Sequence, residues 1–325
     1  MRWLAMVVAA TMGWLSVGVP GARAEDVVRL GNLKFAHYGA VSYMKEIGGH
    51  CGLRVEERVF AKGLDIMPAI VAGEIDVAAS ALDAAIAGRA GGAPIYAVAG
   101  FAAGGARIVG RSDLTLKTVA DLKGRRVGVA RGGAQELLLL AELGRAGLTW
   151  SDHPGKDVQL VYLAFADLNQ ALMAREIDAM SQSEPQSSQA INRGYGTELM
   201  KPYDTPMGRP IRALVMAETF YRGQPEVAAR FMRCFVEATR TFIADPALAE
   251  RYVRETMFKN QISARDYEDA MGNAAFTYDL PVEHVQVTTD MMVQYRVGRM
   301  DRPPRATDWV RLDLLERAKV ELGVR

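Results

Sequence analysis

Cysteine, histidine and long hydrophobic runs are scarce in this sequence, and each scarcity excludes a class of site. Two cysteines and four scattered histidines occur among the 325 residues: Cys51, Cys234, His37, His50, His153 and His284. Neither cysteine lies at metal-ligand spacing from a histidine, so we expect no metal site and no catalytic cysteine. The GxSxG, HExxH, phosphate-loop and CxxC motifs are absent too. We therefore expect a protein that is not an enzyme and that uses no cofactor.

An excess of charge of one sign is also missing. The formal net charge is +1, and no run of lysine or arginine with interleaved aromatic residues occurs, so no nucleic-acid partner is expected. Beyond the N-terminal segment, no stretch approaches the roughly 20 consecutive apolar residues that cross a membrane. The apolar fraction of 50% and the charged fraction of 24% are those of a soluble globular protein. The length favours two domains or lobes.

The first 24 residues have the pattern of an export signal. Met1-Arg2 forms a short positive region, Trp3–Val19 is apolar, and Ala22-Arg23-Ala24 is a small-x-small cleavage site. No cysteine directly follows the apolar region, so a lipid anchor is not indicated. We predict a signal peptide over residues 1–24 and a periplasmic mature chain, whose net charge is lowered by two, to −1.

The two cysteines leave two alternatives open. In an oxidising compartment Cys51 and Cys234 can form one disulfide, but they can equally be two unpaired buried thiols. Their separation in the sequence says nothing about the distance between their Cα atoms, and that distance decides whether a bond forms.

Short β-like and helical segments alternate along most of the chain, which predicts an α/β protein with mostly parallel sheets. The predicted strands are Val27–Leu30, Leu53–Phe60, Asp76–Ser80, Ile95–Phe101, Arg126–Ala130, Val158–Ala164, Asp178–Gln182 and Ile211–Ala217. From Pro225 onward the pattern predicts a helical segment that covers the rest. Its helices are expected at Pro225–Ala244, Pro246–Phe258, Ala264–Thr277, around Glu283–Tyr295, and at Thr307–Leu322 with Thr307 as the N-cap.

An internal repeat indicates two similar lobes. Ala69–Ser80 (AIVAGEIDVAAS) and Ala171–Gln182 (ALMAREIDAMSQ) align without a gap, each as a helix, a tight turn and a short strand. Ligands bind beyond the carboxyl ends of strands in open α/β sheets. The strand ends Ser80-Ala81-Leu82 and Gln182-Ser183-Glu184 are therefore expected to face a common cleft between the lobes.

The stretch GVARGGAQELLLL, Gly128–Leu140, leads from a predicted strand through two glycines into a helix. The first N–H groups of a helix have no internal partner, so this turn is a candidate site for an anion or a polar ligand edge. It lacks the Lys-Ser or Lys-Thr of a phosphate loop and the spacing of a dinucleotide-binding turn. A plain structural turn is the alternative.

Several of these segments resemble one family. VSYMKEIGGHCGLRVEERVF, GEIDVAAS, TVADLKGRRVGVARGGAQELLL, LNQALMAREIDAMSQSEP and INRGYG occur in this order between residues 27 and 235. Together they are similar to the substrate-binding proteins of ABC importers of the alkanesulfonate/taurine/nitrate and thiamine-precursor group. Two places depart from the family pattern: Gly48-Gly49-His50 replaces its Gly-Tyr-Phe, and Ala134 and Gln135 replace its hydroxyl residues.

The resemblance implies a type II periplasmic-binding fold, in which two lobes joined by two crossovers close on a small molecule. It also implies docking on an inner-membrane ABC permease. We expect one lobe from residues 25–112 and 214–325, the other from 113–213, with boundaries near Gly110–Asp113 and Ile211–Ala217. We further expect a monomer.

Several of the predicted ligand-binding residues also have an alternative interpretation, in which the residue has only a structural role or is exposed to solvent. Gly132 and Gly133 would let the backbone approach a ligand that accepts from the N–H groups of Ala134 and Gln135, and Ser80 and Leu82 would line the cleft.

Arg131 would pair with a ligand anion, or be a solvated or lobe-closing side chain. Glu184 would accept from a ligand amine or ring N–H, or cap the helix that begins at Pro185. His37 and Tyr38 would stack on a flat ligand, or be a surface histidine and a packed tyrosine, and Phe165 also favours a flat ligand.

The ligand that these residues favour is a small organic anion or zwitterion: a sulfonate, a carboxylate or a pyrimidine-like molecule. The alternatives are the binding component of a tripartite carrier and a ligand-sensing module of the same fold. An enzyme of the hydroxymethylpyrimidine synthase type is not favoured, because no His/Cys cluster supports it.

The export signal gives the first prediction. The exported protein is expected to begin at or near Glu25, because cleavage follows the small-x-small site. Intact-mass measurement of the periplasmic fraction checks this. Recovery of the chain in the membrane fraction with residues 1–24 attached would instead show that the segment is an anchor.

Overall fold

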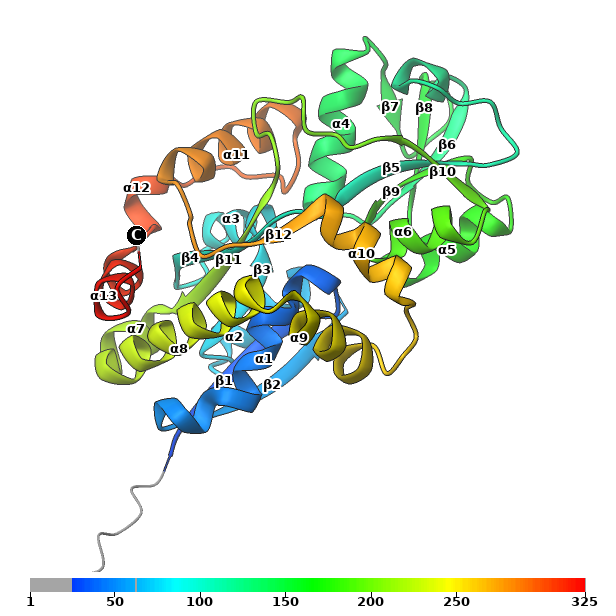
Figure 1. Cartoon of the computed structure of the whole chain (residues 1–325). Coiled ribbons are helices and arrows are strands. Elements are labelled where there is room, and N and C mark those ends of the chain that lie inside the picture. The colour runs from blue at the N-terminus through cyan, green and yellow to red at the C-terminus, as the bar shows by residue number, and fades with distance from the viewer. Residues whose placement is uncertain (1–24, 62, 325) are drawn as a thin grey trace, which may run out of the picture.

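Two β-sheets, each flanked by helices, form two lobes in the computed structural model, which describes residues 25–61 and 63–324 (Figure 1). The predicted signal peptide lies outside the described residues. The first sheet has the strand order β12-β4-β11-β3-β1-β2. With its helices we call it the first lobe, and its strands are β1 (Asp26–Leu33), β2 (Leu53–Phe60), β3 (Val77–Ala81), β4 (Ile95–Gly104), β11 (Ile211–Ala217) and β12 (Ala274–Phe276).

The second sheet belongs to the middle of the chain and has the order β10-β5-β9-β6-β8-β7. With its helices we call it the second lobe. Its strands are β5 (Ala106–Arg111), β6 (Arg125–Val129), β7 (Trp150–Ser151), β8 (Val158–Tyr162), β9 (Ala179–Ser183) and β10 (Gly196–Met200), and its helices are α4 (Ala134–Arg145), α5 (Phe165–Met173) and α6 (Gln186–Asn192).

Both sheets are mixed. β1 pairs parallel with β2 and β3, and β6 pairs parallel with β8 and β9. Every antiparallel pair involves a strand next to a crossing between the lobes: β4, β5, β10 or β11. The two-lobed α/β fold is thus confirmed, but the expectation of mostly parallel sheets is wrong. Strands joined through a helix run parallel, whereas the crossing strands arrive from the other lobe and insert in the opposite direction.

The eight predicted strands are all present, and the chain changes sheet at two places. The first change is at Gly104 and Gly105, between β4 and β5, where φ is +80° and +77°. A Cβ at Gly104 would lie 2.4 Å from the carbonyl oxygen of Asn273, and one at Gly105 would lie 2.8 Å from Cε1 of His37. Both the left-handed backbone and the close approach therefore require glycine.

The second change of sheet is the return through residues 201–210 to β11. The expected return near Ile211–Ala217 lies close to it. The expected first boundary, near Gly110–Asp113, instead falls after β5, which pairs within the second sheet. An apolar strand does not reveal from its sequence which of two sheets it joins.

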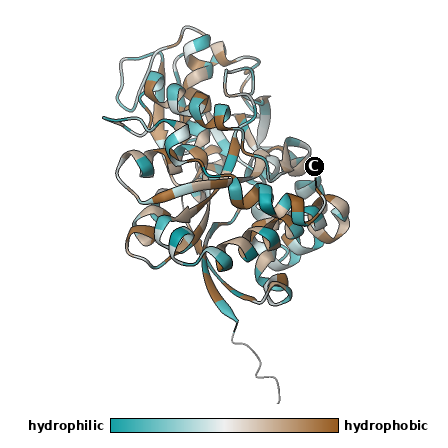
Figure 2. Cartoon of the chain, turned by 90° about the vertical axis from the view of Figure 1, so that its left-hand side faces the viewer, coloured by the Kyte–Doolittle hydropathy of each residue, from teal (hydrophilic) through white to brown (hydrophobic). Residues whose placement is uncertain are grey.

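Ten helices belong to the first lobe: α1 (Gly39–Ile47), α2 (Ile66–Val71), α3 (Leu82–Ala90), α7 (Glu218–Gly223), α8 (Pro225–Ala244), α9 (Pro246–Arg251), α10 (Ala264–Asn273), α11 (Val282–Tyr295), α12 (Ala306–Trp309) and α13 (Asp313–Glu321). These are counted among the described residues. The outer helices carry both hydrophilic and hydrophobic residues along their length in Figure 2, as helices that bury one face do.

Most of the predicted C-terminal helices are confirmed, and two are wrong in part. α8 has the predicted bounds, and α9 continues into a π-helical turn, Tyr252–Met257. The helix predicted to reach Thr277 ends at Asn273, where the chain becomes β12 on the edge of the first sheet. The predicted helix Thr307–Leu322 is split into α12 and α13, and Thr307 lies inside α12 and is not its N-cap.

Two first-lobe helices reach the second lobe. α10 lies against α6, where Asn192 Nδ2 donates to Asp266 Oδ1 at 3.0 Å. α11 contacts both α3 of its own lobe and α4 of the second lobe. Its last residue, Tyr295, packs on Gly144, where an added Cβ would lie 3.1 Å from Cε1 of the tyrosine ring. The C-terminal segment therefore contacts both lobes.

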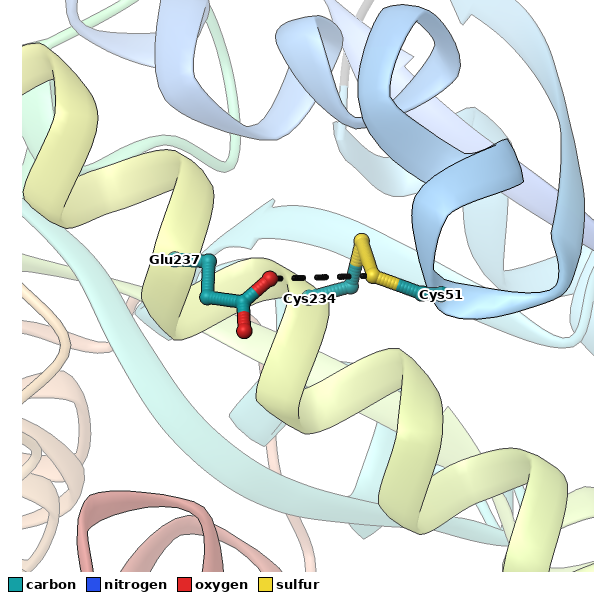
Figure 3. A group of neighbouring side chains, drawn as sticks. All are labelled: Cys51, Cys234 and Glu237. Atoms are coloured by element: carbon teal, nitrogen blue, oxygen red, sulfur yellow. Dashed lines mark hydrogen bonds between the residues drawn. A yellow bond between two sulfur atoms is a disulfide. The ribbon is translucent and has the colours of Figure 1, made fainter. Parts of the chain in front are cut away.

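A disulfide joins Cys51 to Cys234, so the alternative of two unpaired thiols is wrong (Figure 3). Their Cα atoms are 6.1 Å apart, and the bond ties the turn Gly48–Cys51 to α8. Glu237 Oε2 lies 3.8 Å from Cys51 Sγ. These three residues are the one group with metal-ligand spacing in the described part of the chain, and its two sulfurs are bonded to each other. The bond links the first-lobe segments that precede and follow the excursion into the second lobe.

The disulfide is expected to stabilise the fold substantially. It joins residues 183 apart, and a cross-link over a long loop removes conformational freedom from the unfolded chain. The double variant Cys51→Ala/Cys234→Ala should lose about 2–5 kcal/mol in free energy of unfolding. Thermal unfolding followed by circular dichroism, with and without reductant, measures this.

The double variant is its own control, because reductant cannot act on it. Reduced wild type and the double variant are expected to unfold at similar temperatures. A wild type whose Tm does not respond to complete reduction contradicts a stabilising bond.

Candidate ligand-binding site

One edge of the first sheet gathers buried polar side chains from three strands. His37 and Tyr38 follow β1, Asp83 lies in the first turn of α3 directly after β3, and Arg212 is the second residue of β11. β11 runs antiparallel to β3 and places Arg212 opposite Ala81. The start of β11 and the ends of β1 and β3 therefore meet at the edge that faces the second lobe.

Arg212 is the central charge of this group. It is one of the largest fully buried side chains and is only 2% exposed. Within the described part of the chain, no residue accepts a hydrogen bond from its Nη1 or Nη2, although the hydroxyl of Tyr38 interacts with the guanidinium. A buried charge without a partner is strongly unfavourable, because water is removed and nothing replaces it. The guanidinium is thus poised to take an acceptor from outside the chain.

Asp83 is the second unpartnered charge. It is 2% exposed, and neither carboxylate oxygen accepts a hydrogen bond from a described residue. Burial raises the pKa of Asp83 to about 6, and the nearby charge of Glu136 acts in the same direction, whereas the guanidinium of Arg212 opposes the shift. Asp83 therefore faces a positive charge in its own lobe and a negative charge in the other lobe.

The histidines around Arg212 are neutral. Burial lowers the pKa of His37 well below its ordinary value, and the charge of Arg212 adds to this. Both ring nitrogens of His37 are buried without a partner in the described residues. The same two causes lower the pKa of His284 to about 4, and its Nε2 accepts from the backbone N–H of Ile211 at 3.2 Å. These two histidines therefore add no positive charge to that of Arg212.

The predicted glycine turn lies across from this edge in the second lobe. Gly132 has a φ of +73°, and its N–H donates to Glu136 Oε2 at 2.6 Å. Tyr162 donates its hydroxyl to the other oxygen, Oε1, at 2.7 Å. Ala134 and Gln135 are the first two residues of α4, whose N–H groups have no acceptor within the helix. The turn thus presents the N-terminus of α4, where the carboxylate of Glu136 already accepts from the N–H of Gly132.

Arg131 is an exposed side chain at this turn. Its guanidinium lies 3.6 Å from the centre of the Tyr162 ring, and its Nη2 is 3.3 Å from Asp152 Oδ2. The side chain is 55% exposed, and both partners belong to the second lobe. Of the two alternatives for Arg131, the contacts favour a solvated side chain, and its ion pair does not close the lobes.

A cavity of about 250 Å³ separates the glycine turn from the first lobe. Asp83 and Ala87 of α3 form one wall and Arg131, Gly132 and Glu136 form the other. The end of α11 and the residues that follow it close a third side: Met292, Arg296, Val297, Gly298 and Arg299. Arg212 does not line this cavity. Asp83 does, and its carboxylate interacts electrostatically with the guanidinium of Arg212. The cavity is therefore built by both lobes and the C-terminal segment.

Glu184 takes part in a different structure, a buried cluster beside the first crossing. Its Oε1 is 2.9 Å from Arg107 Nε and accepts from Asn273 Nδ2 at 2.9 Å. Its Oε2 accepts from the N–H and the hydroxyl of Ser188, at 3.2 Å and 2.7 Å. The bonds to Ser188, in the first turn of α6, favour the capping alternative. Because Asn273 belongs to the first lobe, Glu184 also links the lobes.

The remaining predicted residues pack closely. The ring of Phe165, the first residue of α5, meets Phe35 of the first lobe edge-on at 5.2 Å between centroids. Tyr38 is buried, as one alternative held, and packs on Phe101 at 4.6 Å. His37 is buried too, so the expected surface histidine is wrong.

Ser80 and Leu82 lie where β3 passes into α3, and both are buried. The hydroxyl of Ser80 donates to the carbonyl oxygen of Ala81 at 3.0 Å. These two residues therefore shape the sheet edge next to Asp83.

The comparison with protein families bears on this arrangement. The model of the NMT1-like family matches residues 9–254, which is most of the chain. The chain belongs to the NMT1-like family.

Solved structures show the same fold at low sequence identity. The alkanesulfonate-binding protein of Xanthomonas axonopodis pv. citri, bound to MOPS, is 19% identical, with a TM-score of 0.75, 90% of this chain and 100% of that chain covered. The periplasmic nitrate-binding protein of Synechocystis is 17% identical, with a TM-score of 0.78, 92% and 89% covered. The NMT1-like protein therefore has the fold of these periplasmic binding proteins.

Two curated relatives match shorter segments. A protein of Escherichia coli with the provisional name aliphatic sulfonates-binding protein is 37% identical over 86 residues, 26% of this chain and 25% of its own length. A provisionally named binding protein of Brucella abortus is 30% identical over 145 residues, 43% of this chain and 41% of its own. The alignments thus span a quarter and two fifths of these relatives. In the described part of the NMT1-like protein, no helix is both long and apolar enough to cross a bilayer.

Sequence reasoning missed Arg212, Asp83 and Glu136 in this NMT1-like protein. Arg212 had a signal, because it is the one charge in the apolar strand IRALVMA. A charge inside a strand that is predicted to be buried must find a partner, and that partner marks a site. Asp83 follows a strand end that was identified correctly, and Glu136 lies in the turn that opens α4.

The glycine turn gives a prediction at Gly133. A Cβ there would lie 3.3 Å from Cζ of Phe165 and 3.3 Å from Oε1 of Gln135. The valine side chain of Gly133→Val should therefore force the turn and the start of α5 apart and weaken ligand binding by about 1–3 kcal/mol, the usual cost of overpacking. Native mass spectrometry of the purified protein with its retained ligand, followed by calorimetric titration of that ligand, measures this.

Folding should survive this substitution, because the backbone of Gly133 is extended and α4 keeps its buried leucines. Far-ultraviolet circular dichroism controls for it. A folded Gly133→Val variant with wild-type affinity would show that the ligand does not approach this turn.

Proposed function

We propose that this protein is the solute-binding component of an ABC importer. It captures a small organic anion or zwitterion between its two lobes and delivers it to a permease in the inner membrane. The observation that carries the proposal is Arg212, a guanidinium buried at the edge between the lobes whose Nη1 and Nη2 have no hydrogen-bond acceptor among the described residues. The NMT1-like family and the shared fold support it.

An anion fits Arg212 for reasons of geometry and charge. The planar guanidinium offers parallel N–H donors, which match the two oxygens of a carboxylate or of a sulfonate. In the closed site the pair is shielded from water, so the attraction is stronger than on a surface. The similar solved structures bind alkanesulfonates and nitrate, which are both oxyanions, according to their descriptions.

The second lobe supplies dipoles. The first N–H groups of α4, at Ala134 and Gln135, carry the positive end of the helix dipole toward the cleft. Glu136 already places one negative charge at this helix N-terminus, where it accepts from the N–H of Gly132. The N–H groups of Ala134 and Gln135 are therefore proposed to donate to a single ligand oxygen and not to bind a second full negative charge. In this proposal the ligand is held mainly by the first lobe and touched by the second, so closure depends on the ligand.

The mouth of the cavity is basic. Arg131, Arg296 and Arg299 line it from the second lobe and from the segment after α11, and all three are exposed. Their field raises the local concentration of anions and speeds their capture, an effect that salt weakens. We propose a periplasmic location for this binding role, on the fold and on the N-terminal signal that the sequence predicts.

Substitution of Arg212 tests the proposal. Arg212→Gln removes the charge and should lower affinity by about 2–4 kcal/mol. The same change should leave the Tm of the ligand-free protein unchanged or higher, because it removes an unpartnered buried charge. Calorimetric titration with ethanesulfonate, propionate and nitrate, together with thermal unfolding, measures both effects.

Two variants serve as controls. Arg251→Gln makes the same change at an exposed residue of α9 and should alter neither quantity. Arg131→Ala should cost less than about 1 kcal/mol of affinity, as exposed ion pairs do. Full affinity in Arg212→Gln, or a large loss of ligand-free stability, would mean that Arg212 serves the fold and not the ligand.

A further inference from the structure

Arginines dominate the segment that joins α11 to α12. Residues 296–305 (RVGRMDRPPR), here called the arginine segment, carry an exposed arginine at every third position: Arg296, Arg299, Arg302 and Arg305. Arg305 pairs with Asp308. The other three form no ion pair and no side-chain hydrogen bond with any residue that the structure describes. The segment therefore holds three exposed cations without a partner.

The arginine segment begins where the two lobes meet. Figure 1 shows α11 reaching toward α4 of the second lobe before the chain turns back to α12. Arg296 is the C-cap of α11 in the left-handed region, with a φ of +56°, and ends the helix there. Pro303 and Pro304 have no N–H group to offer a helix, and residues 296–305 stay irregular and mostly exposed. The segment thus lies on the surface at the mouth of the interlobe cavity.

The three unpaired arginines are spread along this surface. Arg296 and Arg299 line the interlobe cavity and also an outer groove of about 780 Å³. Arg299 and Arg302 line a further hollow of about 530 Å³ beside the end of α3. A single small anion occupies only one such place. Guanidinium groups along three adjoining openings instead match a surface that carries many negative charges.

The positive excess is local. The predicted mature chain has a formal net charge of −1, so the protein as a whole is not attracted to a negative surface. Around the arginine segment, Asp152 pairs with Arg131 at 3.3 Å and Asp308 pairs with Arg305 at 3.2 Å. Asp301 is the one acid of the segment itself. The three unpaired arginines outnumber it, and an attraction to negative charge has to act through this face.

Apolar and aromatic side chains lie next to these cations. Val293, whose carbonyl oxygen accepts from the N–H of Arg296 at 3.3 Å, is 49% exposed. Trp150 and Tyr295 line the outer groove half-buried, with 6.3 Å between their ring centroids. Tryptophan and tyrosine rings suit the boundary between water and lipid, because one end is apolar and the other polar. Cations beside exposed apolar groups are the composition of a surface that binds membranes.

We infer that the arginine segment binds the phosphate groups of an anionic lipid bilayer. This contact goes beyond the proposed function, because it needs no ligand in the cleft. The guanidinium groups donate to phosphate oxygens, and Val293 meets the apolar boundary below them. Each cation contributes little and is screened by salt, so the contact is weak and reversible. It turns the mouth of the interlobe cavity toward the membrane.

A lipid surface fits this face better than an acidic protein does. Charged residues are depleted from the cores of protein interfaces, which are built around apolar and aromatic anchors in shaped pockets. Here the row of unpaired arginines is the main feature, and Val293 is the exposed large hydrophobic residue beside it. A bilayer offers phosphates at every position along the row and needs no shaped partner.

Sedimentation with lipid vesicles tests the inference on the exported chain without added ligand. The vesicles are equal parts phosphatidylglycerol and phosphatidylcholine, or phosphatidylcholine alone. The protein should bind the phosphatidylglycerol vesicles in about 0.1 M salt, where charges act over about 10 Å, and release them in about 1 M salt, where the range is about 3 Å. It should not bind phosphatidylcholine vesicles in either salt.

Neutral variants locate the contact. The triple variant Arg296→Gln/Arg299→Gln/Arg302→Gln should weaken binding to the phosphatidylglycerol vesicles on the order of 100-fold, as three steps of about fivefold each. Arg302→Gln alone should weaken it about fivefold. This single change lies outside the interlobe cavity, so it tests the contact even where the triple variant is less stable.

A matched control removes the same charge elsewhere. Three exposed arginines on or next to α6, α9 and α10 are changed to glutamine together: Arg193, Arg251 and Arg265. This variant should bind the vesicles within a few fold of wild type, since screening limits the reach of distant charges. Thermal unfolding shows that each variant is folded.

Four results overturn the inference. They are equal binding to both kinds of vesicle, undiminished binding by the arginine-segment variants, an equal loss in the control, and release by glycerol phosphate at matched ionic strength, which would indicate a site for one small anion. Binding to polyglutamate but not to vesicles would assign the segment to an acidic protein and overturn it too. None of these results bears on the ligand titrations of Arg212→Gln, so the proposed function is tested separately.

Discussion

A buried guanidinium without a hydrogen-bond acceptor is the constraint on which this account depends. Folding removes Arg212 from water and gives its Nη1 and Nη2 no acceptor among the described residues in return. Such a charge is costly in a finished core, and in the proposed function the partner that it lacks is the ligand. Arg212 does not line the cavity itself, but it interacts with Asp83, which lines the cavity together with Gly132 of the glycine turn and with Arg131, Arg296 and Arg299.

The fold creates this charge through its second crossing. After the return from the second lobe, β11 inserts between β3 and β4 and runs antiparallel to both. Its first residues therefore lie at the edge where β1 and β3 end, and Arg212 comes directly from the hinge into the site. A movement of the lobes about this crossing would therefore take place next to Arg212, the residue that is proposed to hold the ligand.

The first crossing is reinforced by the cluster around Glu184. Arg107 of β5 pairs with Glu184, and its other two nitrogens reach Asp269 of α10 at 3.1 Å and 3.0 Å. Burial acts to raise the pKa of Asp269, but hydrogen bonds from Arg107 outweigh this and lower it. Because α10 belongs to the first lobe, this network joins the lobes where the chain crosses. Glu184 is thus a residue of the hinge, although its place at a strand end resembles that of a ligand contact.

Local patterns in the sequence predicted the local parts of this structure. Eight strands and α8 follow from apolar runs and proline positions, and the glycine turn follows from Gly132 and Gly133 before a leucine-rich helix. The proximity of Arg212 to Asp83 could not be predicted, because it arises from the antiparallel insertion of β11 beside β3, far away in the chain. The disulfide was undecided for the same reason.

Other errors came from residues whose surroundings lie in another segment. His37 follows a strand and resembles a surface residue in the sequence, yet the hinge glycine Gly105 packs against its ring. Residues after Asn273 continue a helical pattern but pair with β4, because the edge of the first sheet has unpaired backbone groups to satisfy. The helical periodicity of a sequence does not reveal that a distant sheet edge will pair with it.

A crystal structure of the protein purified from its native host with its ligand retained tests the central claim most directly. The account predicts that the anionic group of the ligand lies within hydrogen-bond distance of Nη1 and Nη2 of Arg212, between the first-sheet edge and the glycine turn. A ligand bound elsewhere, with Arg212 still unpartnered or bonded only to water, would contradict it.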